Sequence, residues 1–350
     1  MPEPLAVQVP KAAPADAAVA LAQPQELPGA TLFARPDAAK QLYKLDLKLG
    51  FRCNNKCVFC VQGDKRDHVV DLTTEQAFAR LDHGRQSCDA LLLTGGEITV
   101  RSDVPEIIAY ARKVGYTQVQ VQTNGRRLAY LNYCKALIEA GATEFNPSLH
   151  GHVPAMHDGL VGAKGAFDQC VRGITNLVAL EQTVLTQTVI TRQNVNYLPQ
   201  IARLLVKLKV AQVQFAFVHG LGTAALTWND TVPRYSQVAR FLPVALDIVR
   251  EAGISVICEA VPFCFLHGRE WAAIEPRLHP TTVYDGNLEI GDYDRYRHEA
   301  GKLHGPPCAR CSWSTVCEGP WREYPERFGW DEFGDRSDAV PTALLPSASR

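Results

Sequence analysis

From Leu42 onward, short apolar runs alternate with longer amphipathic stretches, a pattern typical of strands followed by helices. The short runs predict strands over Tyr43–Leu49, Ala90–Leu93, Gln118–Gln122, Glu144–Leu149, Val184–Ile190 and Gln212–Val218. The longer stretches predict helices over Thr74–Cys88, Asp103–Val114, Leu128–Ala140, Phe167–Leu180, Leu198–Leu208 and Tyr235–Ala252. Regular alternation of this kind predicts βα units on a parallel sheet.

Six βα units are three-quarters of the eight that close a full barrel, so we expect an α/β fold, a partial (β/α)6 TIM-like barrel, over residues 42–255. A doubly wound open sheet has the same alternation, and periodicity alone does not separate the two. Residues 1–41 are rich in Ala and Pro and predict a disordered arm. The remaining chain divides into a small loop-rich module over 256–330, with a possible hairpin around Val283–Ile290, and a C-terminal tail over 331–350.

The charge balance narrows the possible partners. With 36 Lys and Arg against 37 Asp and Glu the net charge is −1, so the field that would draw the chain to nucleic acid or to an anionic membrane is missing. No window approaches the roughly 18 apolar residues of a spanning helix, and the N-terminus does not resemble a secretory signal. We therefore expect a cytoplasmic protein. In a reducing compartment its 11 cysteines favour metal ligands or redox groups over disulfides.

The clearest chemical motif follows the first predicted strand. It reads Cys53-Asn-Asn-Lys-Cys57-Val-Phe-Cys60. Three thiolates at this spacing can hold one metal centre while leaving one coordination position open for chemistry. A zinc ion completed by a distant ligand, or three loop cysteines without metal, are the alternatives.

This triplet resembles the signature of the radical SAM enzymes. The resemblance implies that Cys53, Cys57 and Cys60 hold a [4Fe-4S] cluster whose fourth iron binds S-adenosylmethionine, with Phe59 near the adenine. Thr94-Gly95-Gly96-Glu97 follows the second strand and is similar to the glycine-rich segment of that family. Gly95, Gly96 and Glu97 are therefore implied to bind the methionine end of the cosubstrate.

Further cosubstrate-binding candidates lie where later strands end, because barrel active sites are built at the C-terminal ends of strands. They are Asn124, Ser148 and Arg192, after the third, fourth and fifth strands. Asn124-Gly125 also suits a simple turn, and Arg192 a solvated surface charge. We interpret a group of nearby histidines as polar lining of the barrel mouth rather than as metal ligands: His150, His152, His157 and His219. No catalytic acid or base is assigned.

The C-terminal region carries a second cysteine cluster. Cys308, Cys311 and Cys317 follow a C-x2-C-x5-C spacing that resembles the start of the SPASM signature, but Trp321 stands where the next cysteine would fall. Apart from the first triplet and three cysteines in predicted helices, five of the 11 cysteines remain, enough for one cluster: Cys258, Cys264, Cys308, Cys311 and Cys317. We favour Cys264 as the fourth ligand over Cys258. The module then resembles the reduced "twitch" variant, with a second, auxiliary [4Fe-4S] cluster. A structural zinc site is the alternative.

The resemblance implies an enzyme, a radical SAM oxidoreductase or maturase. It would cleave S-adenosylmethionine reductively to a 5′-deoxyadenosyl radical, which abstracts hydrogen in a net oxidation or bond-forming modification of a peptide, as in RiPP maturation. The same chemistry on a small-molecule metabolite or cofactor precursor is the alternative, and a non-catalytic iron-sulfur or zinc protein is a more distant one. Implied partners are an electron donor such as flavodoxin or ferredoxin and a separate peptide-recognition protein, since the N-terminal arm is too short to form a recognition domain.

Overall fold

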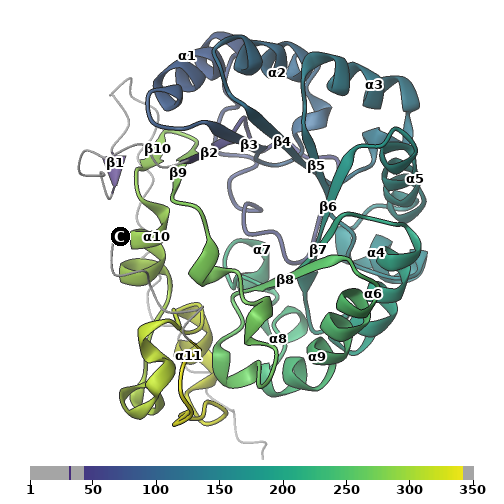
Figure 1. The fold of residues 1–350 in the computed structure, drawn as a ribbon. Helices are drawn as coiled ribbons and strands as arrows, with labels where there is room; N and C mark the ends of the chain where they lie inside the picture. Colours follow the sequence, from purple (N-terminus) through teal and green to yellow (C-terminus); the bar gives the residue numbers. More distant parts are fainter. Residues whose placement is uncertain (1–30, 33–42, 342–350) are drawn as a thin grey trace, which may run out of the picture.

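The computed structural model describes residues 31–32 and 43–341, so nearly all of the predicted arm and the end of the predicted tail lie outside the described residues. Within the described part, no helix is long and apolar enough to cross a membrane. The chain forms a curved sheet surrounded by helices, and α10 (Tyr293–Tyr296) and α11 (Glu323–Phe328) lie at one edge of it (Figure 1).

A ten-stranded sheet organises the molecule, in the order β1-β10-β9-β2-β3-β4-β5-β6-β7-β8. From β2 to β8 each strand pairs in parallel with the next strand along the chain. The predicted strands are present as β2 (Lys44–Lys48), β3 (Ala90–Thr94), β4 (Gln118–Thr123), β5 (Glu144–Pro147), β6 (Thr183–Ile190) and β7 (Gln212–Phe217), and β8 (Ser255–Glu259) adds one more. Sequential order without reversal is that of a barrel, so the doubly wound alternative is wrong.

The predicted hairpin is present but extends the barrel sheet. β9 (Thr281–Asp285) pairs in parallel with β2, and β10 (Leu288–Ile290) runs antiparallel to β9. β1 (Thr31–Leu32) pairs with β10 at the edge. The loop-rich region therefore contributes strands beside β2, the first barrel strand. Because β2 and β9 lie more than 200 residues apart in the chain, no local sequence pattern predicts their pairing.

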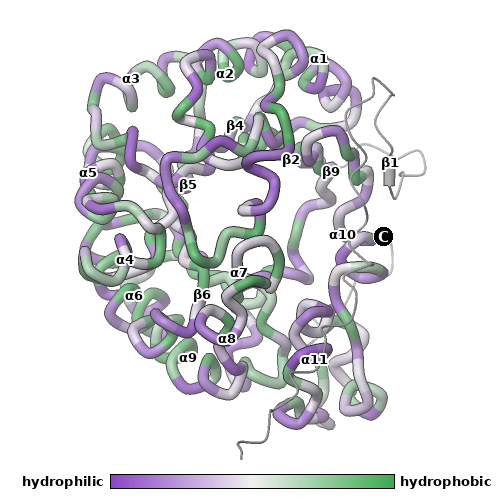
Figure 2. The backbone as a smooth tube through the Cα atoms, turned by 180° about the vertical axis from the view of Figure 1, so that it is seen from behind, coloured by the Kyte–Doolittle hydropathy of each residue, from purple (hydrophilic) through white to green (hydrophobic). Residues whose placement is uncertain are grey.

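Helices cover the outer face of the sheet (Figure 1). Those expected from the sequence are present: α1 (Thr74–Arg85), α2 (Val104–Lys113), α3 (Leu131–Ala140), α5 (Ala166–Ala179), α6 (Leu198–Lys207) and α9 (Tyr235–Glu251). In Figure 2 these helices alternate hydrophobic and hydrophilic segments, as expected for helices with one face on a sheet. Shorter helices went unpredicted because one or two turns show no clear 3.6-residue period: α4 (Pro154–Val161), α7 (Thr223–Leu226), α8 (Trp228–Thr231), α10 (Tyr293–Tyr296) and α11 (Glu323–Phe328).

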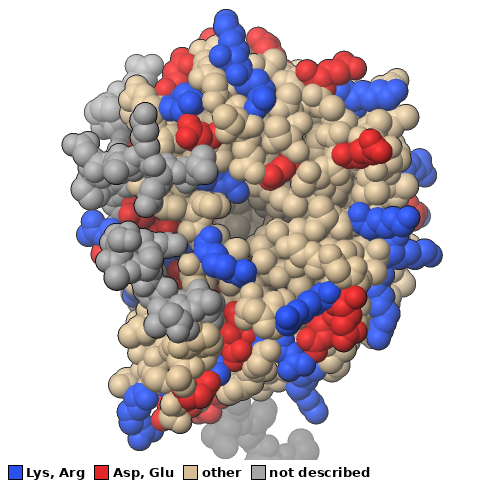
Figure 3. Space-filling view, viewed as in Figure 1, with Lys and Arg blue, Asp and Glu red and all other residues tan. Residues whose placement is uncertain are grey.

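The two faces of the barrel strands differ sharply in polarity. Leu45, Leu47 and Val121 belong to the set that is fully buried in the main apolar core. The alternate positions are polar and bond to one another across strands, in three pairs: Lys44 with Gln120, Gln122 with Gln187, and Gln214 with Glu259. Barrel interiors are usually filled by bulky branched side chains. This one is polar, and the face of the molecule in Figure 3 is hollowed near its centre.

The C-terminal region shares the barrel core instead of building its own. Trp313, Trp321, Tyr324 and Phe333 are buried in the same apolar cluster as the barrel strands. Tyr324 packs on Tyr235 of α9, with ring centroids 4.5 Å apart, and its hydroxyl accepts a hydrogen bond from the Tyr235 amide at 3.0 Å. Aromatic packing therefore attaches this region to α9.

Candidate functional site

The three cysteines of the first triplet lie in the loop that leaves β2, each half-buried. The Asn55 amide donates to the Cys53 sulfur at 3.3 Å, and the Cys60 amide donates to the Cys57 carbonyl at 3.3 Å. Burial raises the pKa of the Cys57 thiol, and the Cys60 and Cys53 thiols raise it further. The three sulfurs therefore share one electrostatic environment, in which a bound metal would displace their protons.

Arg66 provides the positive charge of this site, and sequence reasoning missed it. Its guanidinium donates to the Cys60 sulfur at 3.4 Å and to the Asn55 carbonyl at 2.6 Å. The Cys60 sulfur raises the pKa of Arg66 above its usual range although partial burial opposes this. A fixed cation beside three thiolates stabilises their charged form. No motif marks Arg66, because it acts only through the fold of the loop.

The donor set of this loop fits an iron-sulfur cluster. The three cysteine sulfurs share one electrostatic environment, and the Arg66 guanidinium beside them favours the thiolate form that iron binds. In a [4Fe-4S] cluster each cysteine binds its own iron, so three cysteines would leave the fourth iron open.

Backbone pairing holds the cysteine loop across the barrel mouth. The Lys56 amide donates to the Val161 carbonyl at 2.8 Å, and the Val58 amide donates to the Leu160 carbonyl at 3.0 Å, next to the end of α4. On the other side, the Thr223 amide donates to the Cys60 carbonyl at 2.9 Å. The loop is thus anchored to the segments that follow β5 and β7.

Gly95 and Gly96 let the end of β3 approach this loop closely. The Gly96 amide donates to the Gly50 carbonyl and the Glu97 amide to the Arg52 carbonyl, each at 2.8 Å. A Cβ on Gly96 would lie 2.4 Å from the Arg52 carbonyl oxygen. Gly95 has φ 137°, and a Cβ on it would overlap the backbone of Gly50. The space beside both glycines is therefore filled by the backbone leading to Cys53. This packing requires glycine whether or not a cosubstrate also approaches.

Glu97 links two strand ends from a buried position, with 2% of its surface exposed. One carboxylate oxygen accepts hydrogen bonds from the Thr99 amide at 3.0 Å and from the Thr123 hydroxyl at 2.6 Å. The other accepts from the Asn124 amide. Since both oxygens are engaged, Glu97 positions the ends of β3 and β4 relative to each other.

Asn124 and Arg126 continue this connection to the cysteine loop. The Asn124 side chain donates to the Asn54 side chain at 2.6 Å. The Arg126 guanidinium donates to the Asn54 carbonyl at 2.5 Å and to the Asn55 side chain at 3.1 Å. Arg126 was not expected from the sequence, and the turn residues around it give no signal for such a contact.

The remaining predicted cosubstrate residues are placed differently. Phe59 is nearly buried, with its ring edge-on to His150 at 4.7 Å between centroids. Ser148 is half-buried just after β5, and its amide donates to the Thr123 carbonyl at 2.9 Å. Arg192 is exposed and donates to the Asn229 carbonyl. The structure therefore brings Phe59 and Ser148 to the barrel mouth and leaves Arg192 on the surface.

Two of the nearby histidines are buried structural groups. The His157 ring accepts a hydrogen bond from the His150 amide at 3.1 Å, and the His150 ring accepts one from the Val189 amide at 3.1 Å. Burial lowers the pKa of His157 to about 4. A neutral ring that accepts from the backbone fastens loop to strand, so we assign neither residue to metal binding.

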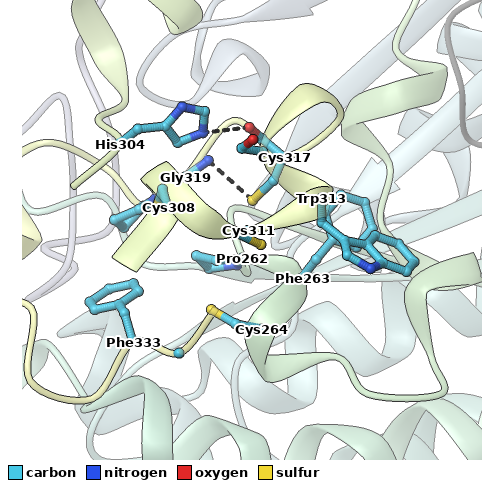
Figure 4. Close-up of a pocket in the computed structure, with 13 residues that line it drawn as sticks. Pro262, Phe263, Cys264, His304, Cys308, Cys311, Trp313, Cys317, Gly319 and Phe333 are labelled. Carbon is cyan, nitrogen blue, oxygen red and sulfur yellow. Dashed lines mark hydrogen bonds between the residues drawn. The ribbon is translucent and has the colours of Figure 1, made fainter. Parts of the chain in front are cut away.

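The second cysteine cluster forms a pocket in the C-terminal region. Cys264, Cys308, Cys311 and Cys317 all line it, and Figure 4 shows Cys264 entering from the side opposite Cys317. The Gly319 amide donates to the Cys317 sulfur at 3.4 Å. Burial raises the pKa of Cys264 to about 12 and that of Cys317 to about 11. Four thiols around one pocket fit an iron-sulfur cluster that would replace their protons.

Cys258 lies elsewhere. It is 1% exposed within β8 and is absent from the lining of this pocket. Trp321, at the position where a further cysteine would fall, is buried with its ring stacked on His219 at 4.0 Å between centroids. The lining of the pocket therefore favours Cys264 as the fourth ligand. Trp321, which stands where a SPASM cysteine would fall, packs in the core and is not a ligand.

Part of the chain is similar to a known protein family. Residues 47–205 match the model of the Radical SAM superfamily. The Fe-coproporphyrin III synthase of Methanosarcina barkeri is 36% identical over 181 residues, 51% of this chain and 45% of that protein. The mycofactocin maturase MftC of Mycolicibacterium smegmatis is 31% identical over 195 residues, 55% of this chain and 49% of that protein. The chain thus spans about half the length of these curated relatives.

Solved structures show the same fold. Streptococcus suis SuiB bound to S-adenosylmethionine superposes with a TM-score of 0.60 at 13% identity, over 85% of this chain and 77% of that one. SuiB bound to its precursor peptide SuiA gives a TM-score of 0.54 at 12% identity, over 76% and 62% of the two chains. Residues 47–205 are therefore similar to a radical SAM domain, a class whose members use a [4Fe-4S] cluster and S-adenosylmethionine, and the fold is that of the SuiB structures.

Proposed function

We propose that the chain is a radical SAM enzyme whose Cys53, Cys57 and Cys60 hold a [4Fe-4S] cluster that binds S-adenosylmethionine. The observation that carries the proposal is the cysteine loop itself, with half-buried thiols beside Arg66 at the carboxyl ends of the barrel strands. With cluster and cosubstrate bound, this centre supplies a 5′-deoxyadenosyl radical that abstracts hydrogen from a substrate.

The residues around the loop divide into two roles. Glu97, Asn124 and Arg126 position the loop against the strand ends through the hydrogen bonds described above. Phe59, Gly95, Gly96 and Ser148 lie at the mouth and are assigned to the cosubstrate side. Arg192 would have to leave the Asn229 carbonyl before it could reach a cosubstrate. Residues 42–255 are proposed as the catalytic barrel and 256–330 as the auxiliary module, with β8 and β9 continuing the barrel sheet across this boundary.

An auxiliary [4Fe-4S] cluster bound by Cys264, Cys308, Cys311 and Cys317 forms the second part of the proposal. The four thiols line one pocket, which supports a twitch-like module. A closed ligand set leaves no iron for S-adenosylmethionine but permits one-electron transfer. That chemistry suits a net oxidation, in which the substrate releases one electron and one proton after hydrogen abstraction.

A peptide is the substrate class we propose, modified as in RiPP maturation. Support comes from the polar barrel interior, from the likeness in sequence to the maturase MftC, and from the likeness in fold to SuiB, whose structure holds a precursor peptide. An external electron donor such as flavodoxin or ferredoxin and a separate peptide-recognition protein are the proposed partners. The alternative is a small-molecule substrate, which the 36% identity to Fe-coproporphyrin III synthase favours.

The central proposal is tested by replacing Cys53, Cys57 and Cys60 together with Ala. After anaerobic reconstitution the wild type should hold about eight irons and the variant about four. Under dithionite the variant should form no 5′-deoxyadenosine. Cys134→Ala, which alters a buried helical cysteine, is the matched control and should keep both activity and iron. Wild-type cleavage by the triple variant would refute the proposal.

The substrate class is tested by deuterium transfer. A fully deuterated cell extract is separated by size into peptides and small metabolites, and each fraction is offered to the enzyme. Deuterium should enter 5′-deoxyadenosine only from the fraction that contains the substrate. Transfer from the small-metabolite fraction alone would replace the peptide proposal with its alternative.

A further inference from the structure

A buried network of charges lies directly beside the auxiliary pocket. The Lys302 ammonium contacts a Glu275 oxygen at 3.1 Å and a Glu318 oxygen at 3.0 Å, with 1% of its side chain exposed. Arg297, also buried, donates to the same Glu318 carboxylate at 2.8 Å and 3.1 Å. Burying charges costs so much solvation that such networks are weak evidence for stability, and an apolar replacement is often as stable. A role other than stability is therefore worth seeking for this network.

The network is joined to the auxiliary ligands by the backbone. Glu318 follows Cys317 in the chain, and Lys302 forms an antiparallel β-bridge with Trp321. The Leu303 amide donates to the Pro320 carbonyl at 3.1 Å, and His304 hydrogen-bonds to the Cys317 carbonyl at 2.6 Å. The segment carrying Lys302 therefore lies alongside the segment carrying Cys317.

Lys302 is the cation of this network that lies in the segment beside the pocket. Two residues further on, His304 lines the pocket, and the Lys302 ammonium contacts the carboxylate of Glu318, the residue after Cys317, at 3.0 Å. The ammonium also lies 4.9 Å from the centre of the Trp321 ring. Glu275 and Glu318 hold it in place, and their attraction keeps Lys302 charged against the effect of burial.

We propose that Lys302 sets the reduction potential of the auxiliary cluster, as a positioning residue whose buried positive charge contacts the carboxylate of Glu318, the residue next to Cys317. This inference rests on the auxiliary cluster of the proposed function. Reduction adds a negative charge to a cluster, and a fixed cation in a low-dielectric surrounding favours the reduced form. Lys302 thereby makes the cluster a better electron acceptor, which is what a net oxidation of substrate requires.

The test uses the full chain in the Cys53, Cys57 and Cys60 to Ala background, so that only auxiliary iron is observed. The midpoint potential of that cluster is measured by EPR-monitored redox titration. Lys302→Met should shift it to a more negative value, and Lys302→Arg, which keeps the charge, should restore most of the shift. Lys113→Met, at the exposed end of α2, is the control for loss of one positive charge and should leave it unchanged.

Loss of Lys302 leaves Glu275 and Glu318 with fewer buried partners and can impair folding. The double variant Lys302→Met with Glu275→Gln removes one charge of each sign and keeps the network balanced. Its potential should still lie below the background value, because Lys302 belongs to the segment that pairs with Pro320 and Trp321 beside the pocket and Glu275 does not. Full iron content with unchanged potentials in both Met variants would overturn the inference alone. A background that takes up no iron would overturn the auxiliary cluster and this inference with it.

Discussion

The Glu97 carboxylate accepts a hydrogen bond from the Thr123 hydroxyl at 2.6 Å, which ties the end of β3 to the end of β4 beneath the cysteine loop. The same carboxylate accepts from the Thr99 and Asn124 amides. A single buried side chain thus sets the relative position of two strand ends that both contact the loop of Cys53.

Replacing Glu97 with Gln should weaken this junction. The new amide nitrogen cannot accept a hydrogen bond, so one of the buried donors loses its partner, at a cost of about 1–3 kcal/mol. Urea unfolding should show that loss, and binding of S-adenosylmethionine should weaken as the strand ends separate. Glu75→Gln, at an exposed position of α1, is the control. Unchanged stability and binding would mean that Glu97 carries no positioning role.

Gly96→Ala should lower iron retention at the first triplet as well as cosubstrate affinity. The added Cβ would meet the Arg52 carbonyl at 2.4 Å and push the loop away from β3. Iron analysis of the reconstituted variant measures this effect. Gly159→Ala is a matched control in α4, since its Cβ would meet nothing within 4 Å. Full iron with weakened cosubstrate binding would instead show that the glycine serves the cosubstrate alone.

Arg126→Met should also reduce iron retention at the first triplet, because Asn54 and Asn55 lose the guanidinium that holds them. The rate at which a chelator removes iron is the appropriate measurement, and we expect it to rise severalfold. The neighbouring Arg127 is exposed, so Arg127→Met provides the comparison. Equal rates for the two variants would argue against a clamp at Arg126.

The two candidates for the fourth auxiliary ligand predict opposite results. In the background without the first triplet, Cys264→Ala should lose auxiliary iron, whereas Cys258→Ala should retain it, since only Cys264 lines the pocket. Iron and sulfide analysis decides between them. Iron loss confined to Cys258→Ala would reverse the assignment.

Buried His157 should make the fold sensitive to acid. Its pKa is about 4 in the folded protein, against about 6.5 when unfolded, so protonation favours the unfolded chain. Stability from this group is fully present above pH 6.5 and is lost as the pH falls toward 4, by up to about 3 kcal/mol. His157→Gln should flatten the pH dependence of the unfolding free energy in this window. His267→Gln, in a surface turn, should not change it.

Local patterns in the sequence determined most of the helices and strands of the barrel and the position of the first cysteine triplet. The helices over Thr74–Arg85 and Tyr235–Glu251 and the barrel strands follow from periodicity, because burial of one face repeats every 3.6 or 2 residues. The cysteine spacing was equally informative, since three ligands within eight residues can share one centre without help from the rest of the chain.

Only the tertiary structure decided what depends on contacts between distant segments. The pairing of β9 with β2, the choice between Cys264 and Cys258, and the burial of Lys302 between Glu275 and Glu318 have no local signature. In the sequence, Arg66 and Arg126 cannot be told from surface charges. Their contacts with the cysteine loop exist only in the folded chain. Each of these features arises because folding removes a polar group from water, and the group must then find its partner wherever the chain path provides one.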